Sequence, residues 1–316
     1  MHTRRILVTG AAGFAGSHLL ERLKADDTHI VGWFKPDMPP PPERPGVDWV
    51  PVELVDRTAV DRAVAEAKAS EIYHLAGAPS VETSWVNAVP HMQINALGTH
   101  YLLRALARAQ RPCRVVVVTS AQIYRVGADP LREDAPLVPS SPYGLTKLAQ
   151  DQLALQSAAE GLDVVIARPF NHVGPRQTPG FAVANFARQV ARIEAGLDPP
   201  VIHVGNLETR RDITDVRDVA DAYVKIMKGG RTGQAYNVCS GRTPRMHDLL
   251  DQLCRLAAVE IAIEVDAARL RPNDLPVIEG DATKLRSQLG WTPRIAIDQT
   301  LQDTLDWWRG LIRRTH

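Results

Sequence analysis

Short hydrophobic runs alternate with segments of helical periodicity through the first half of the chain. Buried strands are predicted at Ile6-Leu7-Val8, at 30–33, 47–52 and 72–75, and at the four valines 115–118. Helices are predicted at 16–24, 57–68 and 93–109, where apolar side chains recur every three to four residues. Strands that alternate with helices pair in parallel through right-handed crossovers. The pattern therefore predicts an α/β fold built on a doubly wound parallel sheet.

The second half of the chain differs in composition and in the spacing of its predicted elements. A segment rich in proline and glycine follows the hydrophobic run 164–167, and helices are predicted near 183–194 and 301–313. We expect residues 1–168 and 213–238 to form the sheet domain, and residues 169–212 and 239–316 to form a smaller, interleaved one. The proline-rich segment 36–45 is predicted to be a connecting loop, because it can neither pair as a strand nor continue a helix.

Composition narrows the class of protein. The 316 residues include 37 Lys and Arg against 36 Asp and Glu, so no overall field attracts nucleic acid or an anionic membrane. The three cysteines, Cys113, Cys239 and Cys254, are far apart, and no His pair has zinc spacing. Neither a signal-peptide pattern nor a run of about 20 apolar residues is present. We expect a cytoplasmic protein with no metal site, no nucleic-acid partner and no membrane contact.

Glycines follow the first predicted strand and open the first predicted helix. They stand in the segment Thr9-Gly10-Ala11-Ala12-Gly13-Phe14-Ala15-Gly16. Such a turn lets backbone amides approach a pyrophosphate, which then lies at the positive end of the helix. The spacing is G-x-x-G-x-x-G rather than G-x-G-x-x-G, so a tight turn without a ligand is the alternative. We expect a dinucleotide coenzyme to contact Gly10, Gly13, Phe14, Ala15 and Gly16.

The end of the second strand bears on the choice between NAD and NADP. An acidic residue there binds the adenosine ribose, whereas a basic residue favours the 2′-phosphate of NADP. Trp33 and Phe34 are followed by Lys35, and the first carboxylate is Asp37. NADP(H) is therefore favoured, with Lys35 as the phosphate partner, and NAD(H) is the alternative. A Lys35 that merely extends from an exposed loop is the competing interpretation.

Tyr143 and Lys147 are four residues apart near the start of a predicted helix, so they share one helical face. A tyrosine ordinarily has a pKa of about 10, and a nearby ammonium together with the positive charge of a nicotinamide favours its phenolate. Ser120, next to Thr119, emerges after the valine strand and supplies a hydroxyl that polarises a carbonyl. We predict Ser120, Tyr143 and Lys147 as the catalytic group; an ordinary helix face is the alternative for YxxxK alone.

Five segments carry a family resemblance: TGAAGFAG (9–16), HLAG (74–77), TSAQIY (119–124), SPYGLTK (141–147) and RPFNHVGPRQ (168–177). On these motifs essentially the whole chain resembles the extended short-chain dehydrogenase/reductase family, the NAD-dependent epimerases and dehydratases. The resemblance implies a Rossmann sheet with a smaller C-terminal substrate domain. It also implies that Tyr143 is the acid/base, that Lys147 binds the nicotinamide ribose, and that Ser120 polarises the substrate.

The second half is similar to the branch of this family that includes GDP-mannose 4,6-dehydratases and the reductases of their 4-keto product. That resemblance implies a substrate that is a GDP-linked or other nucleotide-linked hexose, and a homodimer. It also implies a hexose contact at Ser80, substrate-diphosphate contacts at Asn171 and Arg211, and nucleotide-ribose contacts at Arg271 or Asn273. Leu75, Ala76 and Gly77 are expected to border the coenzyme because they stand at the end of the strand 72–75.

One departure from the family pattern bears on the reaction. Dehydratases of this group carry acidic residues directly after the catalytic Ser/Thr, but Ala121 and Gln122 stand there and cannot act as general acid or base. We therefore expect NAD(P)H-dependent reduction of the 4-keto group of a nucleotide-linked 6-deoxyhexose. A 4-epimerase that retains NAD is the alternative, and a 4,6-dehydratase or a non-catalytic coenzyme-binding sensor is disfavoured.

Overall fold

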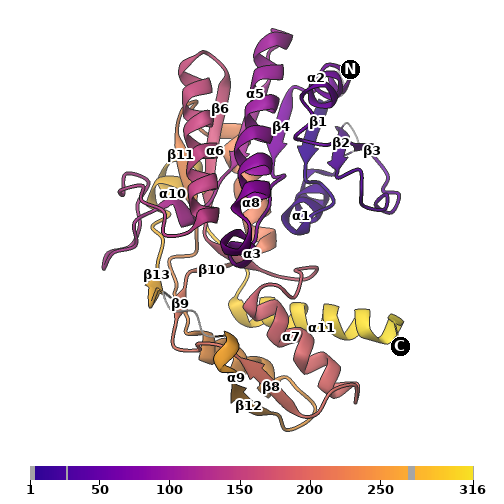
Figure 1. The fold of residues 1–316 in the computed structure, drawn as a ribbon, viewed down its shortest axis with the longest axis vertical. Coiled ribbons are helices and arrows are strands. Elements are labelled where there is room, and N and C mark those ends of the chain that lie inside the picture. The colour runs from indigo at the N-terminus through magenta and orange to yellow at the C-terminus, as the bar shows by residue number, and fades with distance from the viewer. Residues whose placement is uncertain (1–3, 26–27, 270–274, 316) are drawn as a thin grey trace.

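A seven-stranded parallel sheet organises the part of the chain that the computed structural model describes, which is residues 4–25, 28–269 and 275–315 (Figure 1). Its strand order is β11-β6-β5-β4-β1-β2-β3. The strands are β1 (Arg4–Thr9), β2 (Thr28–Phe34), β3 (Val47–Pro51), β4 (Glu71–His74), β5 (Arg114–Val118), β6 (Asp163–Pro169) and β11 (Ala235–Val238). The doubly wound parallel sheet predicted from the sequence is confirmed.

Helices cover both faces of the sheet because successive strand residues point to opposite sides. Ile6 and Val8 pack toward α1 (Phe14–Leu23) and α8 (Val216–Gly229). Leu7, between them, packs toward α2 (Arg57–Ala67), α5 (Gly98–Ala109) and α6 (Pro142–Ala159). The consecutive valines of β5 therefore fill two separate cores, which explains a strand that is hydrophobic throughout.

A smaller lobe lies beyond the carboxyl ends of the strands (Figure 1). Its core is formed by α7 (Ala182–Glu194), α9 (Met246–Arg255) and α11 (Ile297–Thr315), beside the paired strands β8 (Val201–Val204) and β12 (Ala262–Val265). The chain enters this lobe through β7 (Asn171–Val173) and returns through β10 (Ile213–Asp215), which pairs with β7 in parallel.

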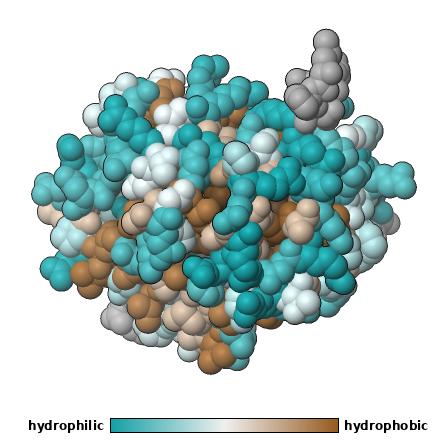
Figure 2. All heavy atoms as spheres, turned by 90° about the horizontal axis from the view of Figure 1, so that it is seen from above, coloured by the Kyte–Doolittle hydropathy of each residue, from teal (hydrophilic) through white to brown (hydrophobic). Residues whose placement is uncertain are grey.

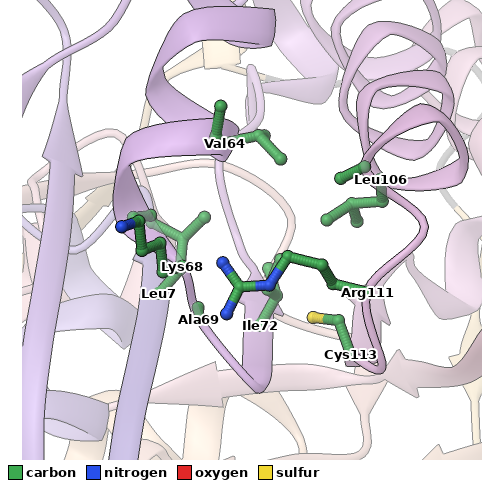
Figure 3. Close-up of a pocket in the computed structure, with 11 residues that line it drawn as sticks. Leu7, Val64, Lys68, Ala69, Ile72, Leu106, Arg111 and Cys113 are labelled. Carbon is green, nitrogen blue, oxygen red and sulfur yellow. The ribbon is translucent and has the colours of Figure 1, made fainter.

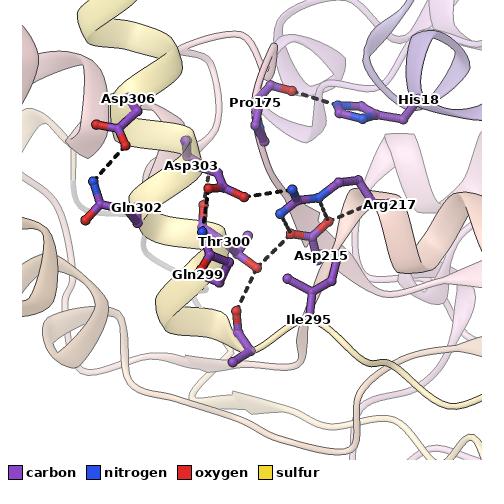
Figure 4. A network of polar contacts seen from close by, with 12 residues as sticks. His18, Pro175, Asp215, Arg217, Ile295, Gln299, Thr300, Gln302, Asp303 and Asp306 are labelled. Atoms are coloured by element: carbon purple, nitrogen blue, oxygen red, sulfur yellow. Dashed lines mark hydrogen bonds and ion pairs between the residues drawn. The ribbon is translucent and has the colours of Figure 1, made fainter. Parts of the chain in front are cut away.

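An ionic network centred on the buried Asp215 ties the lobe to the sheet domain (Figure 4). Asp215 caps α8 by accepting from the amide of Arg217 at 2.7 Å. The guanidinium of Arg217 bridges Asp215 and Asp303 of α11, each at 2.7 Å. The hydroxyl of Thr300 donates to Asp215 at 2.8 Å. Because Asp215 is fully enclosed and each oxygen is bonded, the network fixes α11 against the start of α8.

The helix predicted at 93–109 begins earlier than expected and contains a wider turn. It consists of α4 (Ala88–Met92), a π-helical segment η1 (Gln93–Leu97) and α5. The Asn95 side chain accepts from the amide of Ala78 at 2.8 Å and donates to Thr146 at 2.9 Å. Single π turns of this kind occur often at functional sites, and apolar periodicity alone does not reveal them.

Both hydrophobic and hydrophilic residues are exposed on the surface of the protein. In the face that Figure 2 shows, hydrophobic residues are interspersed among hydrophilic ones. Within the described ranges, every helix is too short or too polar to cross a membrane.

Candidate active site

The predicted catalytic residues converge where β5 and α6 meet. Ser141 caps α6 by accepting from the amide of Gly144 at 3.0 Å, which sets the first helical turn and places Tyr143 and Lys147 on one face. Ser120 follows β5 and forms a side-chain hydrogen bond with Tyr143. Ser120, Tyr143 and Lys147 are 7%, 8% and 5% exposed, so the structure brings all three together in a largely enclosed space.

The protonation of this group follows from burial. Burial raises the pKa of Tyr143 to about 12, and the hydrogen bond from Ser120 counteracts part of that rise. Burial lowers the pKa of Lys147 to about 7, while the Asp151 carboxylate raises it. The Lys147 ammonium donates to the Val118 carbonyl at 3.1 Å and to Gln150 Oε1 at 2.7 Å. In the protein alone the phenol is therefore protonated at neutral pH, which differs from the lowered tyrosine pKa expected from the sequence and suits a proton donor.

The glycine turn has the shape that a dinucleotide pyrophosphate requires. Gly10 has a φ of +67°, and a Cβ there would lie 2.8 Å from the Cα of Ala76. A Cβ on Gly16 would collide with the carbonyl oxygen of Gly10. Helix α1 begins at Phe14, directly after Gly13, and has no side-chain cap at Gly13. Its first amides are thus available to an anion, and the residues present fit a nicotinamide dinucleotide.

The segment after β4 connects this turn to the catalytic lysine. The amide of Ala76 donates to Thr9 Oγ1 at 3.1 Å, directly before the turn. A Cβ on Gly77 would lie 3.4 Å from Lys147 Nζ. Leu75, Ala76 and Gly77 therefore lie between the phosphate turn and the ammonium, in the order that an extended coenzyme requires.

Lys35 lies directly after β2, as expected, but its ammonium is already engaged. It forms an ion pair with Asp37, and both side chains are more than half exposed. Asp37 raises the pKa of Lys35 by hydrogen bonding and by its charge. A 2′-phosphate would have to share or displace this carboxylate.

The predicted substrate residues lie on several different elements, unlike the three predicted catalytic residues. Ser80 caps α3 (Val81–Val86) by accepting from the amide of Thr83 at 3.1 Å, a local role that the sequence analysis did not anticipate. Asn171 opens β7 and is exposed, with Ile213 of β10 as its register partner. Arg211 is half-buried in β9 (Arg210–Arg211), where it donates to the Arg210 carbonyl at 2.8 Å. Arg271 and Asn273 lie outside the described residues.

Sequence reasoning missed polar residues at enclosed positions of helices around the site. Asn95, Thr99 and Gln150 are 0% exposed and hydrogen-bonded to one another or to Lys147. Their signal in the sequence is a polar residue on an otherwise apolar helix face. His172, beside Asn171, stacks on Phe14 of the glycine turn at 5.7 Å between ring centres.

A separate pocket lies beside the central strands of the sheet, away from the catalytic group (Figure 3). It is lined by Leu7, Ile72, Val64, Leu106, Lys68, Ala69, Arg111 and Cys113. Ile72 begins the core of β4 and Cys113 precedes β5, so the pocket is at the amino ends of these strands. Ligands of doubly wound folds bind at the carboxyl ends, so this pocket is unrelated to the site.

Comparison with known proteins identifies the relatives of this chain. The family model for GDP-mannose 4,6 dehydratase matches residues 7–304. The chain is 35% identical to the GDP-6-deoxy-D-mannose reductase of Pseudomonas aeruginosa, over 98% of this chain and 99% of that protein. A solved structure of RMD from P. aeruginosa complexed with NADPH superposes with a TM-score of 0.86 at 34% identity, covering 98% of this chain and all of the other.

Enzymes with other reactions are also similar. A UDP-glucose 4-epimerase from Azospirillum brasilense is 31% identical over 97% of this chain and 92% of its own length. The Thermus thermophilus UDP-glucose 4-epimerase complexed with NAD superposes with a TM-score of 0.85 at 28% identity, covering 97% of this chain and 99% of the other. The shared fold thus serves several reactions and both coenzymes, and the choice among them depends on individual residues.

Proposed function

The chain belongs to the GDP-mannose 4,6-dehydratase family of extended short-chain dehydrogenases/reductases, and from this premise we propose that it reduces the 4-keto group of a nucleotide-linked 6-deoxyhexose with NAD(P)H. The P. aeruginosa relative is named a GDP-6-deoxy-D-mannose reductase, and we propose GDP-4-dehydro-6-deoxy-D-mannose as the substrate of this chain. The observation that carries the proposal is the buried Ser120–Tyr143 pair, in which a protonated phenol is held beside a second hydroxyl.

Two positions favour reduction over dehydration. A 4,6-dehydration requires groups that remove and deliver protons next to the catalytic hydroxyl. Ala121 is buried in the 3-10 turn η2 (Ala121–Ile123), and Gln122 follows it. Neither side chain exchanges a proton near neutral pH. Reduction of a ketone needs only one proton donor at the carbonyl oxygen, and Tyr143 supplies it.

Ser120, Tyr143 and Lys147 have distinct roles in the proposed reduction. A bound nicotinamide coenzyme supplies hydride to the carbonyl carbon. Ser120 donates a hydrogen bond to the carbonyl oxygen, where negative charge develops. Tyr143 transfers its proton to that oxygen, so the ketone becomes an alcohol and the phenol becomes a phenolate. The Lys147 ammonium, enclosed in the same space, stabilises the phenolate by its charge.

We propose the following binding roles for the surrounding residues. Gly10, Gly13, Phe14, Ala15 and Gly16 hold the coenzyme diphosphate, and Leu75, Ala76 and Gly77 border the nicotinamide half. NADP(H) is favoured, with Lys35 exchanging Asp37 for the 2′-phosphate; the P. aeruginosa structure with NADPH supports this choice. Asn171 and Arg211 bind the substrate diphosphate, since a guanidinium and an amide donor both suit a dianion.

The protein is further proposed to act in the cytoplasm as a homodimer. Cys113, Cys239 and Cys254 are free thiols, which a reducing compartment preserves. Large apolar side chains are exposed along α4, η1 and the adjacent α6, namely Met92, Leu97 and Leu145 at 38%, 37% and 52%. A second copy of these helices would cover them.

The test is coenzyme oxidation in the presence of GDP-4-dehydro-6-deoxy-D-mannose. We expect wild type to oxidise NADPH faster than NADH, and Tyr143→Phe to lose about 100-fold or more in kcat, because general acid catalysis contributes about 10²–10⁴-fold. Tyr101→Phe, a half-buried tyrosine on α5, is the matched control and should retain activity. Failure of coenzyme-binding wild type to oxidise either coenzyme would overturn the reductase proposal and direct the search to the 4-epimerase alternative.

A further inference from the structure

A chain of hydrogen bonds runs inward from the catalytic lysine. Lys147 Nζ donates to Gln150 Oε1 at 2.7 Å, and Gln150 Nε2 donates to Thr99 Oγ1 at 2.9 Å. Thr99 Oγ1 is in turn 2.8 Å from His74 Nε2, and His74 Nδ1 is 2.7 Å from Thr9 Oγ1. The four residues beyond Lys147 are each 0% exposed. The chain therefore connects the lysine with the residue that precedes the glycine turn, entirely inside the protein.

The direction of every bond in this chain is determined. The Thr99 hydroxyl donates its only hydrogen to the carbonyl of Asn95 at 2.7 Å, so its oxygen accepts from both Gln150 and His74. His74 consequently carries its hydrogen on Nε2 and accepts at Nδ1 from Thr9, whose oxygen accepts from the amide of Ala76. Since these donors and acceptors are all committed, Gln150 has only one orientation that satisfies the chain. Its carbonyl oxygen must face Lys147.

The Gln150 Oε1 atom matters for the charge of Lys147 because the charged groups nearby have other partners. Burial and the positive charge of Lys147 lower the pKa of His74 to about 3, so His74 is neutral and adds no second cation. Asp151, on the same helix, attracts the ammonium but is already committed to a buried ion pair with Arg168 at 2.8 Å and accepts from Thr119. Tyr143 is neutral, and so is Tyr223, whose pKa is raised by burial and by the charge that Tyr143 would carry. Direct hydrogen-bonding support of the ammonium therefore comes from the neutral oxygens of Gln150 and Val118.

We infer that Gln150 is a positioning residue that holds the Lys147 ammonium in its charged form beside Gly77, and that Thr99, His74 and Thr9 fix its orientation from the glycine turn. This inference rests on the proposed function for its catalytic consequence. The placement of the ammonium itself follows from the hydrogen bonds and holds whatever the substrate is. A neutral amide is suited to this role because it supports the charge without adding a competing base beside Tyr143.

The inference predicts opposite shifts for two substitutions. Gln150→Leu removes the acceptor and should lower the pKa of Lys147, because a buried ammonium loses a charge-assisted hydrogen bond. Gln150→Glu supplies a carboxylate of the same shape and should raise that pKa. In the reductase assay Gln150→Leu should lose about 10- to 100-fold in kcat/KM. The basic limb of the pH profile should move to lower pH in Gln150→Leu and to higher pH in Gln150→Glu.

The decisive measurement is made on the coenzyme-free protein. Competitive labelling with acetic anhydride across pH, read by mass spectrometry of the peptide that contains Lys147, gives the pKa of this one lysine without any turnover. Gln299→Leu, on the exposed side of α11, is the matched control and should leave it unchanged. Should Gln150→Glu leave the pKa of Lys147 where it is in wild type, the inference is overturned, even if Gln150→Leu fails to fold. Opposite shifts in a protein that does not reduce the sugar would support the inference while refuting the proposed function.

Discussion

Tyr143 and Lys147 show what a sequence motif does and does not determine at the scale of the residue. Their four-residue spacing and the hydroxyl after β5 predicted one catalytic group; the structure places the three side chains near one another, and their catalytic roles stay a prediction. Their protonation was not predictable, because it depends on burial and on partners from other elements, such as the Val118 carbonyl of β5 that accepts from Lys147. Two other local contacts were also not predicted from the sequence. Lys35 forms an ion pair with Asp37, two residues away, and Ser80 caps a helix.

The pH dependence of the reduction should report on Lys147. Its pKa is lowered by burial to about 7, whereas that of Tyr143 is raised to about 12. The ammonium is charged below its pKa and neutral above it, so kcat/KM should be level in mild acid and fall as the pH rises through neutrality. Tyr143 stays protonated over the same range, and His74, with a pKa of about 3, does not titrate there.

The variant Lys147→Arg tests whether the decline in kcat/KM comes from Lys147 or from another titrating group. Arginine remains charged at every accessible pH, so any activity that the variant retains should lack the decline above neutrality. Profiles measured at saturating coenzyme for wild type and Lys147→Arg provide the comparison. An unchanged decline in Lys147→Arg would assign it to a different group.

At the scale of the element, the order of strands and helices was predictable because each type has its own spacing of hydrophobic residues in the sequence. Strands alternate with helices from β1 to β5 except between β2 and β3, and this alternation indicated the parallel sheet, while the glycines indicated the turn into α1. The π turn at η1 was not predictable, since it depends on Asn95 bonding across to Ala78 and Thr146. The two-stranded pairs of the smaller lobe join strands far apart in sequence, and such partners carry no local pattern.

The glycine turn should not tolerate a side chain at Gly16. A Cβ there would meet the carbonyl oxygen of Gly10 and the backbone of Ala11. Gly16→Ala should cost about 1–3 kcal/mol of stability through overpacking and weaken NADPH binding, because the turn must open. Thermal unfolding and fluorescence titration with NADPH measure the two effects.

Gly127→Ala is the matched control for this substitution. A Cβ at Gly127 would meet nothing within 4 Å, and its backbone is not in the left-handed region. Unfolding and NADPH affinity should therefore equal those of wild type. Equal stability of Gly16→Ala and Gly127→Ala would show that the turn is less tightly packed than its geometry implies.

At the scale of the whole molecule, the smaller lobe lies beyond the carboxyl ends of the strands, next to the proposed substrate residues. The network around Asp215 and Arg217 anchors α11 to α8 (Figure 4), and β7 and β10 cross between the lobes side by side. Composition and periodicity predicted that a smaller interleaved unit exists. The ionic contacts that hold it depend on side chains far apart in sequence, and no local pattern shows them.

The proposed dimer is a prediction at this scale. Light scattering after size-exclusion chromatography should give twice the mass of the chain for wild type. Leu145→Glu places a charge on the exposed apolar face of α6 and should shift the protein to monomers. Val265→Glu, at an even more exposed position on β12 of the smaller lobe, should remain dimeric. A monomeric wild type would rule out this assembly.

The position of β11 in the sheet also has a consequence for biosynthesis. Strand β6 ends at Pro169, but β11, which pairs with it in register from Ala235 opposite Ile166, is complete only at Val238. At a translation rate of about 5–20 residues per second, the nascent chain carries β6 as an open, hydrophobic edge for several seconds while β7, α7 and β8 leave the ribosome. Unpaired edges of this kind recruit other strands. We therefore expect this interval to be the one in which the growing polypeptide depends most on chaperones.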